Sequence, residues 1–126
     1  MRRWFVVVAA AALACSDSTG PGPSVTVSLA GLPSPRSVYF RYVGQATTVV
    51  GVVPGSTVLS SPVAGDTTAV LVIAPLGQVL AGPIARVAVP NAARALSSAV
   101  LVLVQLAASD YALQTTVGHI LTLQSP

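Results

Sequence analysis

Few side chains in this 126-residue sequence have the types and spacing that chemistry requires. There is one cysteine, Cys15, and one histidine, His119, with three aspartates, six arginines and neither lysine nor glutamate. A zinc site built from several cysteines, an iron–sulfur cluster and an internal disulfide all need more than one cysteine and are excluded. Calcium needs several oxygen ligands in one loop, which three scattered aspartates do not supply. We expect no metal and no cofactor.

His119 is the side chain best suited to proton transfer near neutral pH. The residue types needed for a catalytic triad are present, as a serine with His119 and Asp110. The sequence has no Gly-x-Ser-x-Gly motif, however, to expose a serine nucleophile. His119 shares its parity with Val117, Leu121 and Leu123, which is typical of a histidine packed on or at the end of a strand. We therefore expect no catalytic residue and no enzyme.

One cluster has the character of a binding site. Tyr39 and Arg41 alternate along the same stretch and so share one face of a strand, with Arg36 a short distance upstream. Tyrosine rings and guanidinium groups stack on sugars, peptides and other aromatic groups. Arg36, Tyr39 and Arg41 are the candidate binding residues, while the alternative is that Tyr39 simply covers a neighbouring strand.

The elements that must position these residues are strands. Apolar and polar residues alternate with period two from Val25 onward, and turn residues such as Gly, Pro, Asn and Asp interrupt the pattern mostly every 8 to 14 residues. Strands are expected over residues 25–29, 38–43, 49–53, 69–74, 84–89 and 100–107, with Asp66 and Asp110 in turns. The chain has 22 valines, and it predicts an all-β fold over residues 25–126, an antiparallel β-sandwich of seven to nine short strands.

One short helix is expected in a connection. Helix-forming residues cluster over residues 91–96, with Pro90 before them and Asn91 as a plausible cap. Residues 99–108 could also be read as a buried helix. Their run of Val and Leu, bracketed by Ser97-Ser98 and Ser109-Asp110, favours a central strand instead.

Only 7% of the residues are charged, against about a quarter in an ordinary soluble domain. Ser and Thr number 23 and occupy the positions where solvent-facing charges usually lie. Edge strands without Lys or Glu are weakly protected against pairing with another sheet, so a structural subunit that docks through an uncharged sheet edge is one interpretation. Without residues 1–14 the net charge falls to +1, from four arginines and three aspartates, so nucleic-acid binding is disfavoured.

Residues 1–14 have the pattern of a signal peptide. Arg2 and Arg3 precede ten residues without charge, and ten helical residues measure about 15 Å, half of the roughly 30 Å hydrocarbon core of a bilayer. A buried core helix is the alternative, but the two arginines and the Gly/Pro tract that follows fit it poorly. The pair of arginines also leaves the twin-arginine route open, although the hydrophobic run favours general secretion.

Ala12-Leu13-Ala14-Cys15 resembles the lipobox of bacterial lipoproteins, with Leu13 displaced by one position from the usual pattern. This resemblance implies that Cys15 receives a lipid and anchors the chain to a membrane. Residues 16–24 read Ser-Asp-Ser-Thr-Gly-Pro-Gly-Pro-Ser, so 15–24 is expected to be the lipidated cysteine and a flexible linker spanning about 28 Å when extended.

In outline, the run of turn signals from Gly65-Asp66 to Asp110-Tyr111 also resembles the immunoglobulin-like or cohesin-like sandwiches of exported bacterial lipoproteins. The two resemblances together imply an exported, lipid-anchored protein at the outer membrane or the periplasmic face. We expect a binding or assembly role there, with an envelope protein or a glycan as partner and the membrane held through Cys15.

Overall fold

The computed structural model describes residues 22–108, 110 and 112–126. The expected signal peptide (1–14), the expected lipidation site Cys15 and most of the expected linker (15–24) lie outside the described residues. The first strand begins at Ser24, one residue before the expected domain boundary.

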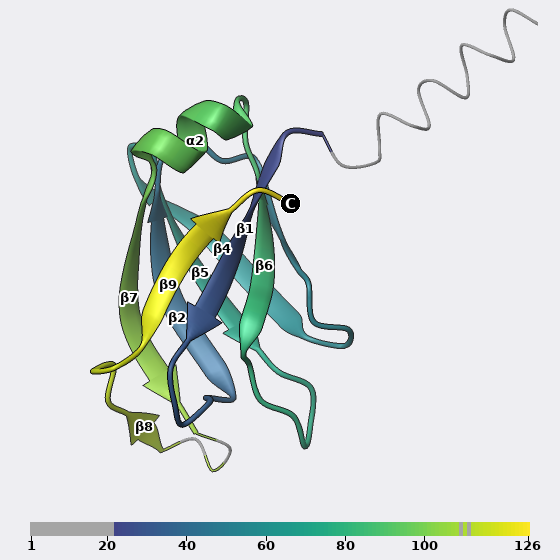
Figure 1. Ribbon diagram of the computed structural model, residues 1–126, viewed down its shortest axis with the longest axis vertical. Coiled ribbons are helices and arrows are strands. Elements are labelled where there is room, and N and C mark those ends of the chain that lie inside the picture. Colours follow the sequence, from purple (N-terminus) through teal and green to yellow (C-terminus); the bar gives the residue numbers. More distant parts are fainter. Residues whose placement is uncertain (1–21, 109, 111) are drawn as a thin grey trace, which may run out of the picture.

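The described chain folds into two antiparallel sheets packed face to face (Figure 1). The four-stranded sheet has the order β3–β6–β1–β9 and consists of β1 (Ser24–Ala30), β3 (Thr48–Gly51), β6 (Gly82–Ala88) and β9 (Ile120–Gln124). The five-stranded sheet has the order β4–β5–β2–β7–β8 and consists of β2 (Ser37–Val43), β4 (Thr57–Ala64), β5 (Thr67–Ile73), β7 (Val100–Ala107) and β8 (Leu113–Gln114). The predicted antiparallel β-sandwich of seven to nine strands is confirmed.

The core lies between the sheets and is built from alternate residues of each strand. Val38, Phe40 and Tyr42 of β2 point inward and are fully buried, while Arg41 and Val43 between and beyond them are exposed. β-Branched side chains fill such a pleated interface well, which explains why valine dominates it. The fully buried inward residues opposite and beside β2 include Val25, Val27, Val70, Val72, Val87 and Leu106.

β1 is buried on both of its faces, from Ser24 to Leu29. Its valines face the core, whereas Ser24, Thr26 and Ser28 lie on the outer face of the four-stranded sheet between β6 and β9. The Ser28 hydroxyl donates to Oε1 of Gln124 on β9 at 3.0 Å. Small hydroxyl side chains therefore occupy the crowded centre of this outer face.

The helix α2 (Ala92–Ser98) covers one end of the sandwich (Figure 1). Its predicted cap is confirmed, because the Asn91 side chain accepts a hydrogen bond from the Arg94 backbone N–H at 3.0 Å. Ala95 turns toward the core and is buried. The alternative helix over residues 99–108 is excluded by β7. Among the described residues, no helix has the length and apolar character needed to cross a membrane.

β4 was absent from the strands expected from the sequence. Its segment Thr57–Ala64 contains Ser60-Ser61-Pro62, which lacks an apolar period and reads as a loop. It forms a strand because it is an edge, where Pro62 needs no outer partner, and a register shift between Pro62 and Ala64 absorbs the irregularity. Tertiary pairing with β5 decides this element, not local propensity.

Both aspartate turns are confirmed. Asp66 lies in the turn that joins β4 to β5. Asp110 lies in a turn between β7 and β8, and its Oδ1 accepts a hydrogen bond from the Ala112 backbone N–H at 3.0 Å. Such a bond to the backbone two residues ahead is the usual role of aspartate in a turn.

A matched pair of leucines tests this arrangement. Leu106 is 0% exposed on the inner face of β7, and Leu59 is 57% exposed on the edge strand β4. Leu106→Ala should lower the free energy of unfolding by about 2–5 kcal/mol because it leaves a cavity, whereas Leu59→Ala should change it by no more than about 0.5 kcal/mol. Urea denaturation measures both, and equal effects of the two variants would contradict the assigned faces.

Candidate functional site

The outer face of the five-stranded sheet carries apolar side chains on all five strands, interspersed with the polar Ser61, Thr67 and Gln105. The register places Leu71 of β5 between Tyr39 of β2 and Leu59 of β4, and it places Val102 of β7 beside Arg41. On the far side, Leu113 of β8 pairs with Ala107 and is 70% exposed. We call this surface the apolar face, and its most exposed members are Leu59, Val100, Val102 and Leu113.

Arg41 is the one charged residue in the five strands of this sheet. Its side chain is exposed, and its cross-strand neighbours are Ala69 on β5 and Val102 on β7. A guanidinium in an apolar surround interacts strongly with a carboxylate once water is excluded, because the local dielectric constant falls. This arrangement can anchor an apolar partner that carries one acidic group.

A shallow depression adjoins Tyr39 on the same face. It has a volume of about 180 Å³ and lies over β2, β4 and β5. Its lining is mostly apolar and consists of Tyr39, Leu59, Ser60, Ser61, Ala69 and Leu71. A protruding side chain of a partner could enter here next to the tyrosine ring.

The structure brings together Tyr39 and Arg41 but not Arg36. Arg36 precedes β2 at a position of the inward parity, is only half-exposed, and has a buried Nε. Its backbone is held on both sides, since its N–H donates to the Ala107 carbonyl and its carbonyl accepts from Ala74, each at 2.8 Å. Arg36 therefore does not share the face that carries Tyr39 and Arg41, because it lies three and five positions before them and side chains alternate between the two faces of a strand.

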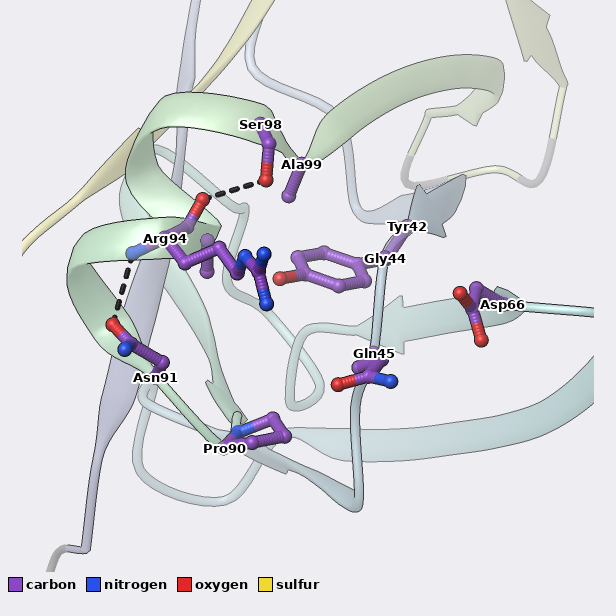
Figure 2. Close-up of a pocket in the computed structure, with 10 residues that line it drawn as sticks. Tyr42, Gly44, Gln45, Asp66, Pro90, Asn91, Arg94, Ser98 and Ala99 are labelled. Carbon is purple, nitrogen blue, oxygen red and sulfur yellow. Dashed lines mark hydrogen bonds between the residues drawn. The ribbon is translucent and has the colours of Figure 1, made fainter.

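A pocket of about 280 Å³ lies beneath α2, at the end of the sandwich (Figure 2). Four elements line it: the end of β2 supplies Tyr42, the following loop Gln45, the β4–β5 turn Asp66, and α2 Arg94. Figure 2 shows the Arg94 guanidinium next to the Tyr42 hydroxyl, with Asp66 on the opposite side of the pocket. Opposite charges thus line one open pocket from two elements.

The Tyr42 hydroxyl is buried and has no hydrogen-bond partner among the described residues. The side chain is 0% exposed, and burial raises the pKa of its phenol above the ordinary value of 10.0. An unsatisfied buried hydroxyl costs about 1–3 kcal/mol of stability. The oxygen lies beside the Arg94 guanidinium at the edge of the pocket, where a ligand acceptor could satisfy it once Arg94 moves aside (Figure 2).

His119 has a structural role, because it holds two loops of the sandwich together. It is 8% exposed, and its Nε2 donates to the Pro33 carbonyl at 2.8 Å, which ties the start of β9 to the loop between β1 and β2. A Cβ at Gly31 would lie 2.5 Å from the Gly118 carbonyl oxygen, so glycine is required for this close approach. Val117 is exposed, and its expected shared parity with His119 is wrong because β9 begins only at Ile120.

Sequence reasoning missed the pocket beneath α2. Tyr42 was counted with the apolar alternation of β2, and Arg94 and Asp66 are far apart in the sequence. One signal in the sequence points to the pocket: Tyr42 lies two residues after Phe40, at an inward position. A buried phenol needs a hydrogen-bond partner, so a polar site is expected near it. Among the described residues, no group of three or more His, Cys, Asp or Glu side chains could hold a metal ion.

The buried phenol predicts an alkaline limit to stability. The pKa of Tyr42 is higher in the folded than in the unfolded chain, so above about pH 10 the unfolded chain releases this proton first and the free energy of unfolding falls. Tyr42→Phe removes the ionisation and the unpaired hydroxyl, so it should be at least as stable at pH 7 and should gain on the wild type as the pH rises past 10. Urea midpoints measured from about pH 8 to pH 11 test this, and parallel profiles would contradict it.

Comparison of the chain with protein-family models, with curated proteins and with solved structures finds no match in any of the three. The immunoglobulin-like or cohesin-like assignment therefore stays a prediction.

Proposed function

We propose that this chain is an exported, lipid-anchored cell-envelope protein with a binding role and no enzymatic activity. Its occupant on the apolar face is another envelope protein, which presents an apolar surface with a carboxylate opposite Arg41. The observation that carries the proposal is that Arg41 is the one charged residue in the five strands of this sheet, on a face where exposed valines and leucines of β2, β4, β7 and β8 predominate.

Charge complementarity selects this occupant. A second copy of the chain docked face to face by a twofold axis through the centre of the sheet would bring two arginines together, and the five strands contain no acidic residue to separate them. An acidic group on a different protein has no such conflict. Tyrosine and arginine are also the residue types most enriched at the energetic centre of protein interfaces.

The sheet edges are the second candidate for docking. The edge strands β3, β4, β8 and β9 contain no charged residue, which favours pairing with another sheet. Three of them are poor templates, because β3 and β8 are short and β4 contains Pro62 and a register shift. β9 alone offers a regular run of five residues. The apolar face is therefore the stronger candidate.

The tether supports a role at a membrane surface. β1 begins at the end of the sandwich covered by α2 (Figure 1), so a lipid on Cys15 would hold this end toward the bilayer. Two or three acyl chains anchor a protein firmly, since each buried methylene contributes about 0.8 kcal/mol. The outer membrane or the periplasmic face is the site we propose.

Cys15→Ala should release the protein from the membrane fraction of the expressing bacterium. The wild-type chain should incorporate labelled fatty acid and the variant should not, because the thiol is the acceptor. Fractionation with and without detergent measures the distribution, and a variant changed elsewhere, such as Val50→Ala, controls for effects on folding. Retention of Cys15→Ala in the membrane, with no label on the wild type, would overturn the anchor.

Two valines on opposite faces test the docking surface. A photocrosslinking residue replaces either Val102, 45% exposed on the apolar face, or Val50, 52% exposed on the outer face of the four-stranded sheet. In intact cells the Val102 position should give a discrete adduct with a second protein, and the Val50 position should not. The crosslinked peptide should contain an acidic residue.

Charge reversal decides whether the adduct reflects the proposed contact. Arg41→Glu should abolish the Val102 adduct, and replacing the partner's acidic residue by lysine should restore it, because the attractive pair is re-formed with opposite sign. An adduct at twice the mass of the chain would instead identify a second copy. Equal adducts from Val50 and Val102, or an adduct unaffected by Arg41→Glu, would also contradict the proposal.

A further inference from the structure

The pocket beneath α2 has the features of a ligand-binding site that is separate from the apolar face. Arg94 and the Tyr42 hydroxyl lie together on one side of it (Figure 2). A protonated phenol and a guanidinium are both hydrogen-bond donors. A carboxylate can accept hydrogen bonds from the two of them at once. Tyr42 is fully buried with no hydrogen-bond partner for its hydroxyl among the described residues, so the donor is in place before any ligand arrives.

Arg94 can move to admit a ligand to this hydroxyl. Its backbone is held by the Asn91 cap and by the Ser98 hydroxyl, which donates to the Arg94 carbonyl at 2.7 Å, while its side chain is exposed. A small rotation of the side chain would uncover the phenol and keep the positive charge at the mouth of the pocket. The helix thus fixes the backbone of Arg94, while the exposed side chain can change its conformation.

The opposite side of the pocket has the opposite charge. Asp66, in the β4–β5 turn, is exposed and lines the pocket, and its backbone carbonyl is fixed by the Gly44 N–H at 2.8 Å. A carboxylate at this position accepts hydrogen bonds from an ammonium group. Gln45, drawn between the two charges in Figure 2, can donate to or accept from the middle of a ligand.

The size of the pocket limits the ligand. Its volume of about 280 Å³ lies just below the range of roughly 300–1,000 Å³ that holds drug-sized molecules. We propose that this pocket binds a small zwitterion of the α-amino acid type, with its carboxylate on Arg94 and Tyr42 and its ammonium on Asp66.

L-alanine, propionate and ethylamine are the probes for this site, because the last two each keep one of the two charged groups. In amide NMR spectra of the full chain, L-alanine should give saturable shifts at Gly44, Ala95 and Ala99 in the millimolar range, with propionate and ethylamine about tenfold weaker or more. Arg94→Gln and Tyr42→Phe should each weaken L-alanine binding by about tenfold. Asp66→Asn should reduce L-alanine to the affinity of propionate and leave propionate unchanged.

Matched controls use the same residue types outside the pocket. Arg41→Gln lies on the apolar face and Asp110→Asn lies in the β7–β8 turn, so both should bind L-alanine as the wild type does. Absence of saturable shifts with L-alanine would overturn the proposal. Shifts that the three pocket variants leave unchanged, or affinity for inorganic phosphate equal to that for L-alanine and insensitive to Asp66→Asn, would overturn it as well. None of these three outcomes affects the docking test on the apolar face.

Discussion

β1 is hydrogen-bonded to β6 along one edge and to β9 along the other, and it is buried on both faces. The other strands of the four-stranded sheet are placed by this strand, β6 and β9 directly and β3 through β6. Its inward valines form one wall of the core, which β2 completes with Phe40 and Tyr42. Its outward serines and threonine must be small because β6 and β9 crowd them. A strand with valine on one side and hydroxyls on the other meets both demands, and this explains the alternation with which the domain begins.

The scarcity of charge takes a different form on the two outer surfaces. On the four-stranded sheet, hydroxyl and amide groups such as those of Thr122 and Gln124 accompany a single arginine, Arg86, which pairs with Thr26 and Val50. On the five-stranded sheet, apolar side chains predominate around a single arginine, Arg41. The two surfaces therefore differ in what they can bind, although neither is strongly charged. The acidic and basic side chains that come together do so at the end of the sandwich, around the pocket beneath α2.

Much of the fold could be predicted because its signals are local. The alternation over residues 25–29 and 38–43, the Asn91 cap and the two aspartate turns each depend on neighbouring residues, and the structure confirms them. β4 could not be predicted, since its strand character comes from pairing with β5. The same alternation assigns Tyr39 and Arg41 to the outer face of β2, as the structure has them, and assigns Arg36 to the inward parity of Val38 and Phe40. The pocket required three segments distant in sequence, so only the buried tyrosine could have indicated it.

The pairing of β1 with β9 also determines the order in which the domain can assemble. Thr26 lies opposite Gln124, so the central strand of one sheet has an open edge until the final strand reaches it. A chain delivered from its amino end therefore keeps β1 incomplete while almost all the remaining residues follow, and contacts of this sequence separation form slowly. Completion of the four-stranded sheet therefore waits for β9. Until then one edge of β1, which contains no charged residue, is open to pairing with another chain.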